Sequence, residues 1–168
     1  MRYVGCLLIA LAGAGMGLYG AYRLRHRAVY LQRAAHLLQV LERRVPHTAQ
    51  PMGVLWRQLA AEAAYEDCGL LQDTAAALSD VSFAAAYTAA VERAQAAGWL
   101  TPAGYGLLME FGAGCGRYDL ERQTEHIRHY RCRCEDLAAE LQQNAATGGK
   151  LYRTGGIAVG VALALLLL

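Results

Sequence analysis

A chain of 168 residues, 55% of them hydrophobic and 18% charged, fits one compact domain with membrane segments better than two soluble domains. Its 16 basic and 14 acidic residues are interspersed and sum to +2, which argues against the broad basic face that nucleic-acid binding requires. Alanine, leucine and glycine dominate, and no segment alternates apolar and polar residues, so we expect an all-helical fold.

The N-terminal segment, residues 1–24, is predicted to be a transmembrane anchor. No residue from Tyr3 to Tyr22 is charged, and a helix that rises about 1.5 Å per residue crosses the roughly 30 Å hydrocarbon layer over this length. Three basic residues follow at once: Arg23, Arg25 and Arg27. The positive-inside rule then places the next residues in the cytoplasm. A signal peptide cleaved at small residues between positions 10 and 14 is the alternative, which the arginines disfavour.

Two glycines lie four residues apart in this segment, Gly13 and Gly17. Small residues at this spacing let a second membrane helix approach closely, so the pair is a candidate helix-packing site. The preferred explanation is nevertheless that glycine is simply common in membrane helices.

The C-terminal segment, residues 150–168, is predicted to be a second membrane segment. From Gly155 to Leu168 it has no charge, but 14 residues make a helix of only about 21 Å. Lys150 and Arg153 can snorkel and lengthen the segment by an interfacial turn. They also put positive charge on the side of the central domain, so both segments predict a cytoplasmic centre. Whether the segment crosses the membrane or only dips into it stays open.

The central domain, residues 25–149, is predicted as a series of helices. The first has an apolar stripe with spacings of three and four residues. The stripe comprises Leu31, Ala34, Leu38, Leu41 and Val45. Pro46 is expected to end this helix, a second to run from Pro51 to Gly69, and a short one to cover residues 70–78.

The next two helices have local start and stop signals. One is expected to begin at Asp80 or Ser82 and to stop at Gly98. The other opens with Thr101, a preferred N-cap residue, followed by Pro102 at the first helical position.

The longest helix is predicted from about residue 118 to 146. Apolar residues recur every seven positions, at Leu120, Ile127, Cys134 and Leu141. Such a narrow seam is suited to packing against the first helix, so we expect an antiparallel up-down bundle. Gly148 and Gly149 should loosen the chain before the last segment.

No residue pattern predicts catalysis or a bound cofactor. His126 and His129 could share a helix face with Cys132, but neighbouring arginines would repel a metal ion, so a solvated, salt-bridged face is preferred. Glu66 and Asp67 are expected to be surface charges. The five cysteines include no CxxC pair and predict free thiols in a reducing compartment. We therefore expect that the protein is not an enzyme.

The stretch from Phe111 to Asp119 resembles the FGxxLGxxDxxxQxxxI signature of the stage III sporulation protein AB family. Six residues match it: Phe111, Gly112, Gly116, Asp119, Gln123 and Ile127. Cys115 stands where that family usually has leucine. The glycine-rich N-terminal span, the leucine-rich first helix and the closing Lys150–Tyr152 extend the resemblance over essentially the whole chain.

The resemblance implies a fold similar to the cytoplasmic helical domain of the F-type platform protein of type II secretion systems, flanked by the two membrane helices. It implies a non-enzymatic scaffold role in a secretion-like channel complex between mother cell and forespore, on the mother-cell side of the membrane. Implied partners are a secretion-type ATPase and other proteins of the same sporulation operon, with a homo-oligomer possible. The alternative is a membrane-anchored helical adaptor or sensory protein.

The motif has a physical interpretation of its own. Gly112 and Gly116 are expected to let the preceding helix turn sharply with positive φ, and Asp119 to cap the long helix. We therefore predict a structural role for the motif, and a partner-binding hot spot is the alternative.

Overall fold

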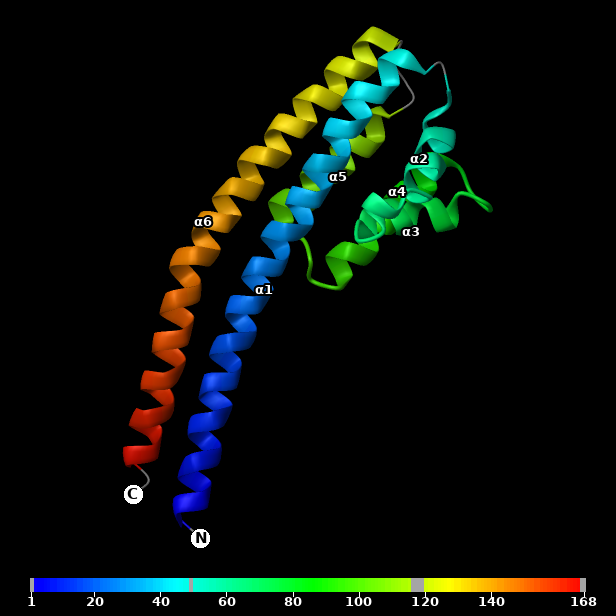
Figure 1. The fold of residues 1–168 in the computed structure, drawn as a ribbon. Helices are drawn as coiled ribbons and strands as arrows, with labels where there is room; N and C mark the ends of the chain where they lie inside the picture. The colour runs from blue at the N-terminus through cyan, green and yellow to red at the C-terminus, as the bar shows by residue number, and fades with distance from the viewer. Residues whose placement is uncertain (1, 49, 116–119, 167–168) are drawn as a thin grey trace. The chain divides into compact units, whose positions relative to one another are not determined.

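The computed structural model describes residues 2–48, 50–115 and 120–166, and side chains within 19–48, 50–115 and 120–147. The described part of the chain is all-helical, which confirms the predicted fold class (Figure 1). Its α-helices are α1 (Arg2–Arg44), α2 (Met52–Ala60), α3 (Gly69–Ala77), α4 (Phe83–Ala96), α5 (Pro102–Gly114) and α6 (Leu120–Leu166). Two 3₁₀ turns, η1 (Val45–His47) and η2 (Ala63–Tyr65), follow α1 and α2.

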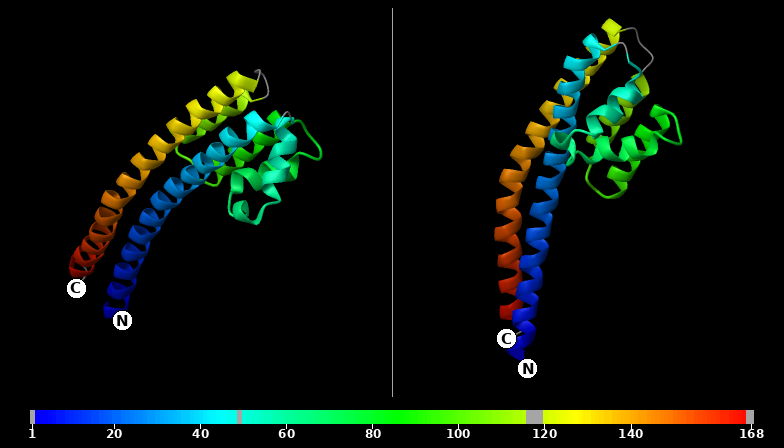
Figure 2. Two further views of the ribbon diagram at one scale, coloured as in Figure 1. Left: turned by 45° about the horizontal axis from the view of Figure 1, so that its top comes forward. Right: turned by 45° about the vertical axis from the view of Figure 1, so that its right-hand side comes forward.

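The chain forms two compact units. One is a helical bundle of residues 29–138, which contains α2 to α5 with the last part of α1 and the first part of α6. The other consists of the first part of α1, up to Ala28, and the last part of α6, from Ala139. Within this second unit the two helices lie side by side and antiparallel, as the adjacent ends show in all views (Figures 1 and 2).

None of the helices is both long and apolar enough to cross a bilayer, over the residues that the structure describes. The two predicted membrane helices, at 1–24 and 150–168, therefore have no support from that part of the chain. Their backbone is helical over 2–24 and 150–166. The side chains of Lys150 and Arg153, and the surroundings of Gly13 and Gly17, lie outside the described residues.

Helix α6 continues without interruption where the sequence predicts a looser chain. Residues 147–150 are helical within α6, so the predicted end of the long helix at about residue 146, with a looser chain at Gly148 and Gly149, is wrong. A glycine costs a helix interior only about 1 kcal/mol relative to alanine. That cost is small beside the cooperative hydrogen bonding of a 47-residue helix.

The start and stop signals of α4 and the start signal of α5 are confirmed. Ser82 Oγ accepts a hydrogen bond from the backbone N–H three residues on, at 3.4 Å. Thr101 Oγ1 does the same at 3.1 Å for Gly104. α4 ends at Ala96, and Gly98 follows its C-cap with a φ of 75°, which fits the left-handed residue after a helix. The Trp99 N–H donates to the Ala94 carbonyl at 3.0 Å.

The predicted helix from Pro51 to Gly69 is wrong, because α2 ends at Ala60 and Gly69 begins α3 instead of ending a helix. Gln72 Nε2 donates to the Ala60 carbonyl at 3.1 Å and also to the Tyr65 carbonyl at 3.3 Å. The first contact satisfies a carbonyl group at the end of the interrupted helix, and the second adds to the bond that the Tyr65 carbonyl accepts from the Cys68 N–H at 3.0 Å. The break is thus held by contacts from α3, which periodicity does not reveal.

The core of the 29–138 bundle follows the predicted stripe of α1. All five stripe residues are buried: Leu31, Ala34, Leu38, Leu41 and Val45. On α6, Ile127 and Cys134 are fully buried as predicted, but Leu120 is 49% exposed. The seven-residue seam therefore begins one repeat later than expected, because Leu120 is the first residue of its helix.

Candidate functional site

Phe111, near the end of α5, lies at the centre of a series of aromatic rings. Its ring meets that of Tyr87 in α4 edge-on, with centroids 5.8 Å apart, and stacks on that of His126 in α6 at 5.6 Å. Tyr87 also meets Trp56 of α2 edge-on at 5.8 Å. Phe111, Tyr87 and Trp56 are fully buried. The first residue of the motif therefore joins α5 to α4 and α6, and Tyr87 extends the series of rings to α2.

Gly112 is required by close packing and not by a turn. It lies inside α5, and among the described residues only Gly98 has a positive φ. A Cβ atom at Gly112 would lie 2.4 Å from Cδ1 and 2.6 Å from Cε1 of Tyr87. The predicted sharp turn at Gly112 is therefore wrong, because the absence of a side chain serves the approach of α4 to α5.

Gly114 lies equally close to α6. A Cβ atom there would lie 2.3 Å from Cε1 of His126. Nε2 of His126 is 3.1 Å from the carbonyl oxygen of Phe111. A carbonyl oxygen can only accept a hydrogen bond, so Nε2 carries the proton and donates it. His126 thus packs against the end of α5, and the prediction of a solvated face is wrong for this residue. Its only sequence signal was the nearby glycines, which allow close approach.

The motif residues of α6 complete the same junction. Gln123 is 5% exposed and Ile127 is fully buried. Burial raises the pKa of the Cys115 thiol to about 12, against the opposing effect of a hydrogen bond with Gln123. Gly116 and Asp119 lie outside the described residues, so the predicted turn and helix cap at these positions stay predictions.

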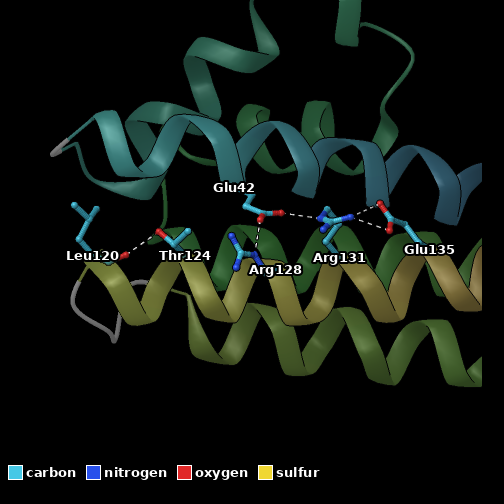
Figure 3. Close-up of polar contacts among 6 residues, drawn as sticks. All are labelled: Glu42, Leu120, Thr124, Arg128, Arg131 and Glu135. Atoms are coloured by element: carbon cyan, nitrogen blue, oxygen red, sulfur yellow. Dashed lines mark hydrogen bonds and ion pairs between the residues drawn. The ribbon is translucent and has the colours of Figure 1, made fainter.

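A second polar feature joins α1 to α6 within the same bundle (Figure 3). The Nε atoms of Arg128 and Arg131 donate to the two carboxylate oxygens of Glu42, each at 2.7 Å. Arg131 Nη1 also donates to both carboxylate oxygens of Glu135, at 2.7 and 2.8 Å. The hydrogen bond from Arg128 has the largest effect on the pKa of Glu42 and, together with that from Arg131, holds it below its ordinary value. Burial acts in the opposite direction and raises this pKa. Sequence reasoning missed Glu42, because opposite charges on two distant helices give no local signal.

The arginines of α1 that are predicted to set the membrane topology lie beside exposed aromatic residues. Arg23 and Arg25 are exposed and Arg27 is half-buried. Tyr19 and Tyr22, which precede them, are 67% and 66% exposed. Exposed tyrosines followed by arginines are typical of membrane–water interfaces.

The buried thiols of the bundle take part in packing. In the described ranges, no three side chains of histidine, cysteine, aspartate or glutamate are placed to hold a metal ion. Burial raises the pKa of the Cys134 thiol to about 12, so it stays protonated and a poor nucleophile at neutral pH. Cys132, two residues away, is exposed and does not point into that core.

The chain is similar to one family over nearly its whole length. The family described as stage III sporulation protein AB matches residues 2–168. A solved structure titled "Stage III sporulation protein AB (SpoIIIAB)" has 21% sequence identity and a TM-score of 0.60, with 71% of this chain and 96% of that chain covered. At this identity the likeness shows a shared fold. None of the curated proteins compared with the chain matches it.

Proposed function

The chain belongs to the stage III sporulation protein AB family, whose match covers residues 2–168, and on this premise we propose that it is a non-enzymatic membrane platform in a sporulation-specific secretion-like channel complex between mother cell and forespore. Membership of the family gives a role in sporulation, and it bears out the resemblance of the Phe111–Ile127 motif. That match over nearly the whole chain is the observation that carries the proposal.

A scaffold role is supported by how the polar and reactive groups of the bundle are used. His126 is stacked on Phe111 and hydrogen-bonds its carbonyl group. Glu42 is held by two arginines, and Arg131 is shared between two carboxylates. Groups that are engaged in this way fix the relative placement of helices, which a platform requires, and leave little freedom for proton transfer.

Attachment to the membrane through both ends of the chain is part of the proposal. It is supported by the uncharged stretches 3–22 and 155–168. It is also supported by the exposed residues around the end of the first stretch, Tyr19, Tyr22, Arg23 and Arg25. In this arrangement the 29–138 bundle would face the cytoplasm of the mother cell. A fold similar to the type II secretion F domain would then present the bundle to a secretion-type ATPase and other proteins of the same operon.

The test is the recovery of partners from sporulating cells. Full-length tagged protein is solubilised from membranes, and proteins that copurify are identified by mass spectrometry. The platform role predicts recovery of a secretion-type ATPase together with small membrane proteins of the same operon. A Gly112→Val variant, which should disrupt the bundle, is the matched control and should lose them. Recovery of a kinase or receptor in their place would support an adaptor instead.

A further inference from the structure

A cleft of about 420 Å³ opens between the end of α1 and the beginning of α6, within the 29–138 bundle. One wall comes from α1 and η1, and the other from the first turns of α6. Their polar residues are Gln39, Arg43 and His47 on the first wall, and Thr124, Arg128 and Arg131 on the second. Glu42 lies between the two walls and contacts Arg128 and Arg131 (Figure 3).

The cleft is more basic than the chain as a whole. Three guanidinium groups and one carboxylate line it, whereas the entire chain has a net charge of only +2. Arg128 has a side chain that is 64% exposed and binds Glu42 through Nε, while its Nη groups make no hydrogen bond within the described residues. Arg43 is exposed and forms no ion pair within the same ranges. Donors for a further anionic group are thus available.

Glu42 prepares the cleft and does not fill it. Its side chain is only 16% exposed, and its two oxygens each fix the Nε of one arginine. A guanidinium held in this way loses less side-chain entropy when it binds a second carboxylate, because its orientation is already set. The cleft is therefore preorganised for a charge-assisted, forked hydrogen bond.

An exposed apolar residue indicates the class of ligand. Leu120 does not line the cleft but lies one helical turn before Thr124, whose Oγ1 donates to the Leu120 carbonyl at 2.9 Å (Figure 3). Its side chain is 49% exposed. Pro46, on the other wall, is also exposed. A free anion would use only the cationic groups, whereas a polypeptide with acidic and apolar side chains uses both.

We propose that this cleft is the docking site for an acidic segment of a partner protein, whose carboxylates bind Arg43 and Arg128 while an apolar side chain covers Leu120. The inference rests on the proposed platform function and specifies how the bundle holds a partner. The complementary charges set the orientation and the rate of association, and the apolar contact adds affinity.

A photo-crosslinking amino acid at position 47 of the full-length protein, in sporulating cells, tests the proposal. The crosslinked peptide, sequenced by mass spectrometry, should be rich in aspartate and glutamate. Charge reversal by Arg43→Glu with Arg128→Glu should lower the crosslinking yield roughly tenfold or more. Reversal of an exposed arginine on α2, by Arg57→Glu, is the matched control and should leave the yield unchanged.

Two further measurements make the result decisive. Lysine substitutions in the captured acidic segment should restore crosslinking to the Arg43→Glu, Arg128→Glu variant, and its circular dichroism should match that of the unmodified protein. No crosslink, a captured peptide without clustered carboxylates, or a yield that charge reversal leaves unchanged would overturn the cleft proposal. Failure of the platform function is a separate result, because it appears as loss of the ATPase and operon proteins from the pull-down of the unmodified chain.

Discussion

Substitution of Gly112 by alanine tests the packing role of the motif. The added Cβ atom would lie 2.4 and 2.6 Å from two carbons of the Tyr87 ring, about 1 Å inside ordinary contact. Tyr87 is fully buried between Trp56 and Phe111 and has little room to move. Overpacking of this kind costs about 1–3 kcal/mol, while alanine returns about 1 kcal/mol of helix propensity.

Gly106→Ala on the same helix is the matched control, because a Cβ atom there meets nothing within 4 Å. The gain in helix propensity is common to both variants, so their difference isolates the clash with Tyr87. We expect Gly112→Ala to have a free energy of unfolding about 1–3 kcal/mol below that of Gly106→Ala.

Denaturant unfolding of the solubilised full-length chain measures the difference. Fluorescence of Trp56 reports on the bundle, in a Trp99→Phe background that removes the second tryptophan. Tyr87→Leu should make room for the new methyl group, so the double variant should lose less stability than the sum of the two single variants. Equal stability of Gly112→Ala and Gly106→Ala would refute the argument.

Three further predictions concern Gly114, Glu42 and the two cysteines of α6. Gly114→Ala should destabilise the bundle in thermal unfolding, and the added substitution His126→Ala should recover much of the loss; an unchanged loss would contradict the 2.3 Å approach. Glu42→Gln should cost about 1 kcal/mol at neutral pH. The pKa of Glu42 is lowered in the folded state, so the stability that its carboxylate contributes is present above the ordinary glutamate pKa of about 4.5 and is lost as the pH falls below it. The unfolding free energies of the unmodified protein and the Glu42→Gln variant should therefore converge in acid. Maleimide should label exposed Cys132 in the folded protein but Cys134, with a pKa of about 12, only after unfolding, and equal labelling rates by mass spectrometry would count against its burial.

Features set by neighbouring residues could be predicted from the sequence. Ser82 and Thr101 each accept the hydrogen bond that their position predicts, because an N-cap needs only a backbone N–H three residues on. Gly98, with its positive φ just after the C-cap of α4, could be predicted for an equally local reason. The buried stripe of α1 follows from helical periodicity alone.

Features set by distant residues could not be predicted. The break after Ala60 depends on hydrogen bonds from Gln72, which is 12 residues away. The pairing of Glu42 with Arg128 and Arg131 spans 86 and 89 residues. A glycine that permits a turn and one that permits close packing also look alike in sequence, and only the position of Tyr87 distinguishes the two roles at Gly112.

The motif and the cleft lie on the same bundle but should respond differently to substitution. Phe111, Gly112 and Ile127 are buried, so a change at any of them acts through the stability of the whole bundle and reduces every activity together. Arg43 is exposed and takes no part in the Glu42 pairs, so its reversal should leave the fold intact while it weakens one partner. A variant that forms no spores but unfolds normally would therefore point to a surface such as the cleft. A sporulation defect that scales with lost stability would point to the aromatic junction.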